Sequence, residues 1–246
     1  METNLHLSTN IEIYQDNKLI CHTHNTLTNS GKGAIHKLLT STASINKLAL
    51  SYLASTQTVD TPMYPDVVLK EIDLEICSAY AEAVYETNKA AYANRNQKQR
   101  HRLLRQNVCG KMAELAFYDF VTRAGLSASF PDFMIYRQPK KSFSPDMHLE
   151  YNGRKISCHV KSQDKIREQR WSASWLFEKN KDPLVMAPLE HADELLVFVR
   201  VDDLKVEIRG MIWVPEALPY FKATVLPFLS TKTALYYNDL AKAGLV

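Results

Sequence analysis

Residues 146–161 read DMHLEYNGRKISCHVK, with the pair Asn152-Gly153 at their centre between two alternating segments. Asn-Gly supplies the two positive φ angles of a type I′ turn, so the pair predicts a two-residue β-hairpin. The turn also fixes the register of the hairpin. Counting outward from it pairs residue 151 with 154 and places Asp146 opposite His159.

The two faces of this hairpin differ in character, because side chains alternate across a strand. The apolar face carries Met147, Leu149, Ile156 and Cys158. The polar face carries Asp146, His148, Glu150, Lys155, Ser157 and His159, and Lys161 continues it. Directly opposed residues have Cβ atoms about 5 Å apart. We therefore expect Asp146, His159 and Lys161 to converge on one patch.

A carboxylate, a second ligand and a lysine on one sheet face are the groups that metal-assisted phosphodiester hydrolysis uses. The carboxylate binds a hard cation, which polarises the phosphoryl oxygen and lowers the pKa of its bound water. The lysine orients that water or stabilises the developing charge. The same residue types also occur on solvated hairpin faces. Both interpretations are open at this point.

A helix glutamate and a strand glutamine add to the candidate site. In GKMAELAF, Glu114 lies in line with Phe117 and Val121, at i+3 and i+7 of a predicted helix. A carboxylate in an apolar stripe needs a cation or a hydrogen-bond donor. The alternatives are that Glu114 reaches water at the rim of the core or favours the helix N-terminus. Gln163 lies farther along the polar face of the second predicted strand.

This ordered set of residues resembles the PD-(D/E)xK nuclease superfamily, which includes type II restriction endonucleases, Holliday-junction resolvases and repair nucleases. The set is Glu114 in a helix, Pro145-Asp146, a hairpin, and His159-Val160-Lys161, within roughly residues 97–214. The resemblance implies a site built around Mg²⁺. In it, Asp146, Glu114 and His159 would bind the cation, Lys161 would assist the attacking water, and Gln163 would lie near the scissile phosphate.

The sequence departs from the family pattern at one position. The family has Asp or Glu where this chain has His159. A neutral imidazole can bind a divalent ion, but it suits Mn²⁺ or softer metals better than Mg²⁺. Mg²⁺ is thus the expected cofactor, with Mn²⁺ as the alternative.

The basic residues are unevenly distributed, although the net charge is only +3. Residues 87–113 contain seven bases and no acid, and residues 137–170 contain nine bases and four acids. The predicted phosphate contacts are Lys98, Arg100, Arg102, Arg105, Lys111, Lys140, Lys141, Lys165, Arg167 and Arg170. A DNA backbone needs such charges, and the binding weakens with added salt. The other interpretation is an ordinary solvated face.

Residues 1–60 are predicted to form a small N-terminal α/β module, to which no chemistry is attached, and residues 61–246 a nuclease-like domain. In the module, residues 11–24 suggest two strands around Asp16-Asn17, and residues 31–39 suggest a helix. In the main domain, helices are predicted over 66–94, 97–123, from 215 and from 232, and strands over 133–136, 146–151, 154–161, 194–201 and 206–214. The order of elements predicts an α/β (α+β) fold with helices on the faces of a sheet. The resemblance implies a restriction endonuclease-like mixed central sheet.

Several classes are not favoured. The longest apolar run, 195–199, is far short of a membrane helix, and residues 1–10 lack the pattern of a secretory signal. The four cysteines form no CxxC pair, so we expect a reducing cytoplasm. A zinc site of His148, Cys158 and His159 is disfavoured, because the predicted hairpin places Cys158 on the opposite face.

We interpret the chain as a metal-dependent DNA endonuclease, most similar to type II restriction enzymes. A homodimer is expected because cutting both strands needs two sites. The alternatives are an inactive nucleic-acid-binding protein of the same fold, or a structural or assembly protein that uses residues 1–60. The aromatic group Trp171, Trp175 and Phe177 fits either a DNA-facing loop or the core.

Overall fold

The computed structural model describes residues 66–97, 99–137, 143–151, 153–224 and 230–246, together with the backbone of 8–15 and 18–26. The two strands predicted near the N-terminus are confirmed as β1 (Ser8–Gln15) and β2 (Lys18–Thr26), which pair antiparallel. The predicted turn at Asp16-Asn17 and the predicted helix over 31–39 lie outside the described residues. So do Lys98, Lys140, Lys141 and Asn152.

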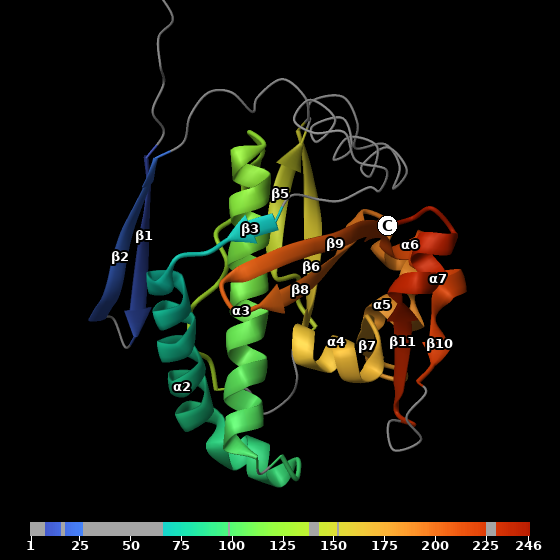
Figure 1. Cartoon of the computed structure of the whole chain (residues 1–246), viewed down its shortest axis with the longest axis horizontal. Coiled ribbons are helices and arrows are strands. Elements are labelled where there is room, and N and C mark those ends of the chain that lie inside the picture. Colours follow the sequence, from blue (N-terminus) through green and yellow to red (C-terminus); the bar gives the residue numbers. More distant parts are fainter. Residues whose placement is uncertain are drawn as a thin grey trace, which may run out of the picture.

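Two long helices, α2 (Glu71–Asn94) and α3 (Arg100–Arg123), lie side by side along one side of the sheet (Figure 1). The start of α2 is fixed by Asp73, whose carboxylate accepts the backbone N–H of Lys70 at 2.8 Å. The end of α3 is followed by Gly125, whose φ of 82° ends the helical path. Both helices were predicted from their apolar spacing.

The main sheet has six strands in the order β3-β9-β8-β6-β5-β4. The strands are β3 (Asp66–Val68), β4 (Ser127–Ala128), β5 (Met147–Tyr151), β6 (Arg154–Asp164), β8 (Glu194–Asp202) and β9 (Lys205–Trp213). The pair β6–β8 is parallel and the other neighbours are antiparallel. The prediction of a mixed α/β sheet flanked by helices is therefore confirmed.

The hairpin of β5 and β6 has the predicted register. Met147 pairs with Cys158 and Tyr151 with Arg154, and Gly153 has the positive φ, 73°, that the turn requires. The ladder ends at Met147, so Asp146 is not directly paired with His159. Its backbone N–H instead donates to the carbonyl of Cys158 at 2.9 Å.

The sheet is covered on both faces, and β8 shows why. Its residues 195–199 are all buried and alternate between two cores. Leu195, Val197 and Val199 face the core formed with α2 and α3. Leu196 and Phe198 face a second core that includes Trp175 and Phe177. A strand covered on both faces must be apolar at every position, which explains its continuous apolar run.

The second core lies under a smaller three-stranded sheet and short helices (Figure 1). The strands are β7 (Ser174–Glu178), β10 (Lys222–Ala223) and β11 (Lys232–Tyr236). The helices are α4 (Lys165–Trp171), α5 (Pro183–Met186), α6 (Val214–Ala217) and α7 (Tyr237–Lys242), with 3₁₀ turns η3 (Pro188–His191) and η4 (Leu218–Tyr220). No described helix is long and apolar enough to cross a membrane.

Three predictions of secondary structure are corrected, the first being the helix over 66–94, whose opening residues Asp66–Val68 form strand β3 while α2 begins at Glu71. Residues 133–136 form no strand, because Phe133 is held among aromatic rings, 5.2 Å from Tyr80 between centroids. The predicted helix from Lys232 begins as β11, which pairs with β7, a strand that the sequence analysis missed. The pairing partner lies more than fifty residues away, so local sequence does not reveal it.

The close packing at Gly210 leads to a prediction about stability. A Cβ atom at this position would lie 2.6 Å from Cβ of Val246, which is buried in the second core. We expect Gly210→Ala to lower the free energy of unfolding by about 1–3 kcal/mol through overpacking. Urea unfolding measures this. Gly110→Ala in α3 is the control, since a Cβ there meets nothing within 4 Å and should not destabilise. Equal effects of the two variants would contradict the prediction.

Candidate active site

Asp146 lies where the hairpin opens. Beyond Cys158, strand β6 continues to Asp164, and among the described strands it pairs there with β8 alone. At this point the Asp146 carboxylate accepts the backbone N–H of Val160 at 2.7 Å. This bond holds the carboxylate at the edge of β6 that β5 no longer covers.

Glu114 is buried on α3, beside the same region of the sheet, and forms an ion pair. Its carboxylate lies 2.6 Å from Nζ of Lys111, and both side chains are about nine-tenths buried. Lys111 also donates to the carbonyl of Asp132 at 2.7 Å, and its Nζ lies 5.0 Å from the ring centroid of Tyr80. Lys111 therefore does not lie on the predicted basic surface. The spacing i, i+3 on one helix was the sequence signal for this pair.

Burial, opposed by Lys111 and assisted by the negative charge of Asp146, raises the pKa of Glu114 to about 8. A carboxyl group whose pKa is higher in the folded state binds more protons there than in the unfolded state. Its contribution to stability is therefore largest below the unfolded value of 4.5 and is lost as the pH rises toward about 8.

We accordingly expect the free energy of unfolding of the wild type to fall between pH 5 and pH 8 relative to Glu114→Gln. The difference between the two proteins should change in that direction by no more than about 1.4 kcal/mol per pH unit. Urea unfolding of both proteins across this range measures it. A difference that is flat or grows with pH would contradict the assignment.

His159 is buried on the other face of β6, where it contacts Glu194 at the start of β8. Its Nε2 lies 2.6 Å from Oε2 of Glu194, and Oε1 of the same carboxylate lies 3.0 Å from Nδ1 of His191. Burial lowers the pKa of His159, and the charge of Lys161 lowers it too, whereas the hydrogen bond that its Nε2 donates to Glu194 acts in the opposite direction. Burial alone would raise the pKa of Glu194, but its bonds to His191 and His159 outweigh this, so the pKa is lowered.

Glu194 was not among the predicted site residues, because it was only the first residue of the predicted strand 194–201 and belonged to no motif. It reaches His159 through the parallel pairing of β8 with β6, in which Glu194 is the partner of Ser157. No local sequence motif predicts that two strands thirty residues apart will pair in parallel. Only the assembled sheet brings this carboxylate to the imidazole.

Lys161 and Gln163 follow His159 on the same face of β6. Nζ of Lys161 lies 5.2 Å from the ring centroid of Phe177, and its charge lowers the pKa of His159, so the two groups are neighbours. The Gln163 amide accepts the backbone N–H of Ser174 at 2.9 Å and donates to the carbonyl of Ser172 at 3.0 Å. Gln163 thus anchors the start of β7.

The predicted convergence of four groups is partial. Glu114 belongs to the α3 side of β6, whereas His159 and Lys161 belong to the opposite face. Asp146 lies near enough to both for its charge to raise the pKa of Glu114 and of His159. Within the described ranges, no group of three or more His, Cys, Asp or Glu side chains could hold a metal ion.

Cys158 is fully buried against the α3 face, as the hairpin predicted. Burial raises the pKa of its thiol, which keeps the thiol protonated and unreactive. Cys77 and Cys109 are also buried free thiols.

His148 contacts Ser157 on the opposite strand of the hairpin. The distance between Nδ1 of His148 and the hydroxyl oxygen of Ser157 is 3.3 Å.

Most of the described basic residues predicted to contact DNA are paired with acids. The pairs are Arg100 with Glu82, Arg105 and Arg167 with Asp164, and Lys165 with Asp202. The guanidinium of Arg170 lies 4.8 Å from the ring centroid of Trp171, and Arg102 is exposed near the start of α3. Of the aromatic group, Trp175 and Phe177 are core residues, and Trp171 is 37% exposed.

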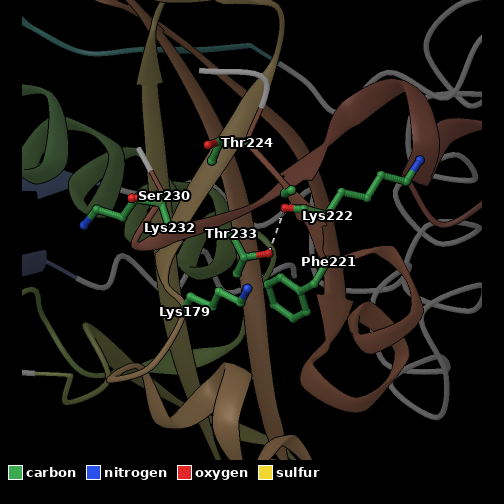
Figure 2. Close-up of a pocket in the computed structure, with 8 residues that line it drawn as sticks. Lys179, Phe221, Lys222, Thr224, Ser230, Lys232 and Thr233 are labelled. Carbon is green, nitrogen blue, oxygen red and sulfur yellow. Dashed lines mark hydrogen bonds between the residues drawn. The ribbon is translucent and has the colours of Figure 1, made fainter. Parts of the chain in front are cut away.

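A separate pocket of about 430 Å³ lies beside β10 and β11. Figure 2 shows the ammonium group of Lys179 near Phe221 and Thr233, whereas the side chains of Lys222 and Lys232 extend away from each other. These two lysines are paired with Asp239 and Glu178. The pocket therefore concentrates little uncompensated charge, and none of the predicted site residues lines it.

Comparison with known proteins provides no family for the chain, since no family model, curated protein or solved structure matches it.

Proposed function

We propose that the protein is a metal-dependent DNA endonuclease with a restriction endonuclease-like fold. The observation that carries the proposal is the position of Asp146. Its carboxylate is fixed by the Val160 N–H at the point where β5 ends, on the strand that bears Lys161, and it influences the pKa of the buried Glu114. This is the combination of helix Glu, PD aspartate and x-x-Lys strand that motivated the family resemblance.

The order of the elements also supports the proposed fold. A long helix, α3, is followed by the antiparallel strands β4, β5 and β6, and then by α4 and the parallel strand β8. The glutamate lies on the helix, the aspartate precedes the middle strand, and the lysine lies on the third. An endonuclease fold needs these groups on neighbouring elements around one strand end.

The carboxylates fit a divalent cation of the Mg²⁺ class. Such an ion keeps several waters and binds through one or two carboxylates together with substrate phosphate oxygens, so it does not need three protein ligands. Asp146 and Glu114 would supply the two carboxylates. Like charges raise the pKa of Glu114, and a cation would favour its ionised form. When bound, the ion would supply charge stabilisation and a more acidic water.

The side chains of the protein would position the reacting groups and stabilise the developing charge. Asp146, held by Val160, would keep its position without loop movement, and preorganised groups contribute most to catalysis. Lys161 would turn from the ring of Phe177 toward the phosphate and stabilise the developing negative charge. The imidazole of His159 lies beside Lys161 and would help to keep this amine directed at the site.

Basic residues at the start of α3 support DNA as the partner. Arg100 and Arg102 lie in the first turn of this helix, where there is no acid. Cations near a helix N-terminus are unfavourable by roughly 0.3–1 kcal/mol each. Arg100 is compensated there by its pair with Glu82, so the exposed Arg102 is the cation whose position is better explained by an anionic partner than by stability. A phosphate backbone would satisfy both the helix end and Arg102.

The direct test is nicking of supercoiled plasmid DNA by the wild type with Mg²⁺ and with Mn²⁺, with EDTA as the blank. We expect metal-dependent nicking, a reduction of about 10²-fold or more in Lys161→Met, and no change in Lys155→Met, an exposed lysine of the same hairpin. Equal activity of the two variants would remove the proposed role of Lys161. Size-exclusion chromatography with DNA tests the expected homodimer.

The second candidate is a DNA-binding protein of the same fold without catalysis. The contact between His159 and Glu194 favours it, because the position that carries an acid in the family is occupied by an imidazole already held by another residue. Isothermal titration with Mn²⁺ separates the candidates. Binding of DNA with no binding of Mn²⁺ at millimolar concentration favours the second candidate.

A further inference from the structure

Trp171 ends helix α4 and keeps an aromatic ring at the surface of the protein. The residue is 37% exposed, whereas Trp175 is buried. Trp171 belongs to neither of the two cores that the described residues form. The guanidinium carbon of Arg170 lies 4.8 Å from the centroid of its ring. Packing of the described residues therefore does not explain why a tryptophan occupies this position.

The backbone directly after Trp171 is strained. Ser172 has φ 64° and ψ 164°, a conformation that is favourable only for glycine. The buried Gln163 holds it there, since its amide donates to the carbonyl of Ser172 at 3.0 Å and accepts the backbone N–H of Ser174 at 2.9 Å. Gln163 lies on the same strand, β6, as Lys161. These hydrogen bonds therefore fix the position of Trp171 relative to the strand of the candidate site.

The surface beside this ring is basic. Helix α4 begins where β6 ends (Figure 1), and there Arg105 and Arg167 share the carboxylate of Asp164 at 3.0 and 3.2 Å. One carboxylate against two guanidinium groups leaves a net positive charge. Arg170 is exposed and pairs with no acid among the described residues. The acid of α4, Glu168, is paired with two arginines of the main sheet and does not offset these charges.

We propose that Trp171 and Arg170 bind an unpaired nucleotide of the DNA, with the indole stacked on its base and the guanidinium in contact with its phosphate. The inference rests on the proposed function for DNA as the partner. It names the substrate class as DNA that contains a single-stranded segment.

The exposed face of the ring favours a single strand over a duplex. A base in an intact duplex has both faces covered by its neighbours, so an indole at the protein surface can stack only on a base that is unpaired. Proteins that bind single strands combine such aromatic rings with a basic surface that follows the phosphate backbone. Arg105, Arg167 and Arg170 supply that basic surface.

The test measures binding without cleavage, by fluorescence anisotropy of a labelled oligothymidylate of about 12 nucleotides in EDTA. A duplex of the same length is the second ligand. We expect Trp171→Ala to weaken binding of the single strand about 10-fold and to change binding of the duplex less than about 2-fold. Trp171→Phe keeps an aromatic ring and should stay within about 3-fold of the wild type. Leu189→Ala is the control, since it changes a residue of η3 that is 75% exposed, and it should bind like the wild type.

Quenching of tryptophan emission by the unlabelled oligonucleotide is the second readout. We expect quenching in the wild type and in Leu189→Ala, and its loss in Trp171→Phe, which still binds the single strand. Arg170→Ala should reduce the slope of log affinity against log salt concentration by roughly 0.7, the effect of one lost phosphate contact on a single strand.

Three results would overturn the inference: equal affinity of the wild type and Trp171→Ala for the single strand, an equal loss of affinity for the duplex, or no quenching in the wild type. If such a protein nicks plasmid DNA with metal, the proposed function stands without this inference. A wild type that binds the single strand through Trp171 but nicks no DNA would instead overturn the proposed function and leave this inference standing.

Discussion

Asp146→Asn is expected to lower the rate of metal-dependent DNA cleavage by at least about 100-fold while the protein stays folded. The asparagine side chain keeps an oxygen that can accept the Val160 N–H, so the anchor at 2.7 Å survives. What is lost is the negative charge that a hard cation requires. The variant therefore separates the charge of Asp146 from its structural contact.

The measurement is single-turnover cleavage of plasmid DNA, with urea unfolding to show that stability is kept. Asp146→Ala removes the hydrogen bond as well and should lose the same activity together with about 1–3 kcal/mol of stability. Glu150→Gln is the control, since it neutralises an exposed acid on the polar face of the same hairpin. Cleavage by Asp146→Asn at the rate of Glu150→Gln would remove Asp146 from the site.

Lys111→Met is expected to destabilise the folded protein by about 3–5 kcal/mol at alkaline pH, where Glu114, whose pKa is about 8, is ionised. The substitution keeps the unbranched apolar chain beside Tyr80 but leaves the carboxylate of Glu114 buried without its partner. It also leaves the carbonyl of Asp132 without the ammonium donor at 2.7 Å. Losing one member of a buried ion pair costs far more than losing an exposed pair.

The destabilisation should shrink as the pH is lowered, because a protonated Glu114 carries no charge to leave unpaired. The double variant Lys111→Met/Glu114→Gln should recover most of the loss for the same reason. Lys89→Met is the matched control, since Lys89 faces Glu86 across an exposed helical pair and should change stability by less than about 0.5 kcal/mol. A loss in Lys111→Met that is independent of pH, and is not recovered in the double variant, would show that the ion pair is not its cause.

The residues of the predicted site are brought together in two ways, by closeness in the sequence and by the pairing of distant strands. Lys111 and Glu114 are three residues apart on one helix, so their pairing is visible in the sequence, although Lys111 was assigned to the DNA surface. His159 and Glu194 are thirty-five residues apart, and they meet only because β6 and β8 lie parallel in the sheet. Arg105 and Arg167 were predicted from the sequence to contact phosphate. Only the fold shows that both arginines form ion pairs with Asp164.

The sequence alone determined the hairpin, its register and the division of its side chains between two faces, because an Asn-Gly turn and strand alternation act within a few residues. It also determined the two long helices and the buried strand β8 through their apolar patterns. The tertiary structure decided where the ladder stops, so that Asp146 holds Val160 instead of lying opposite His159. It also decided which partner each buried charge has, because a buried charge takes the nearest compensating group in space.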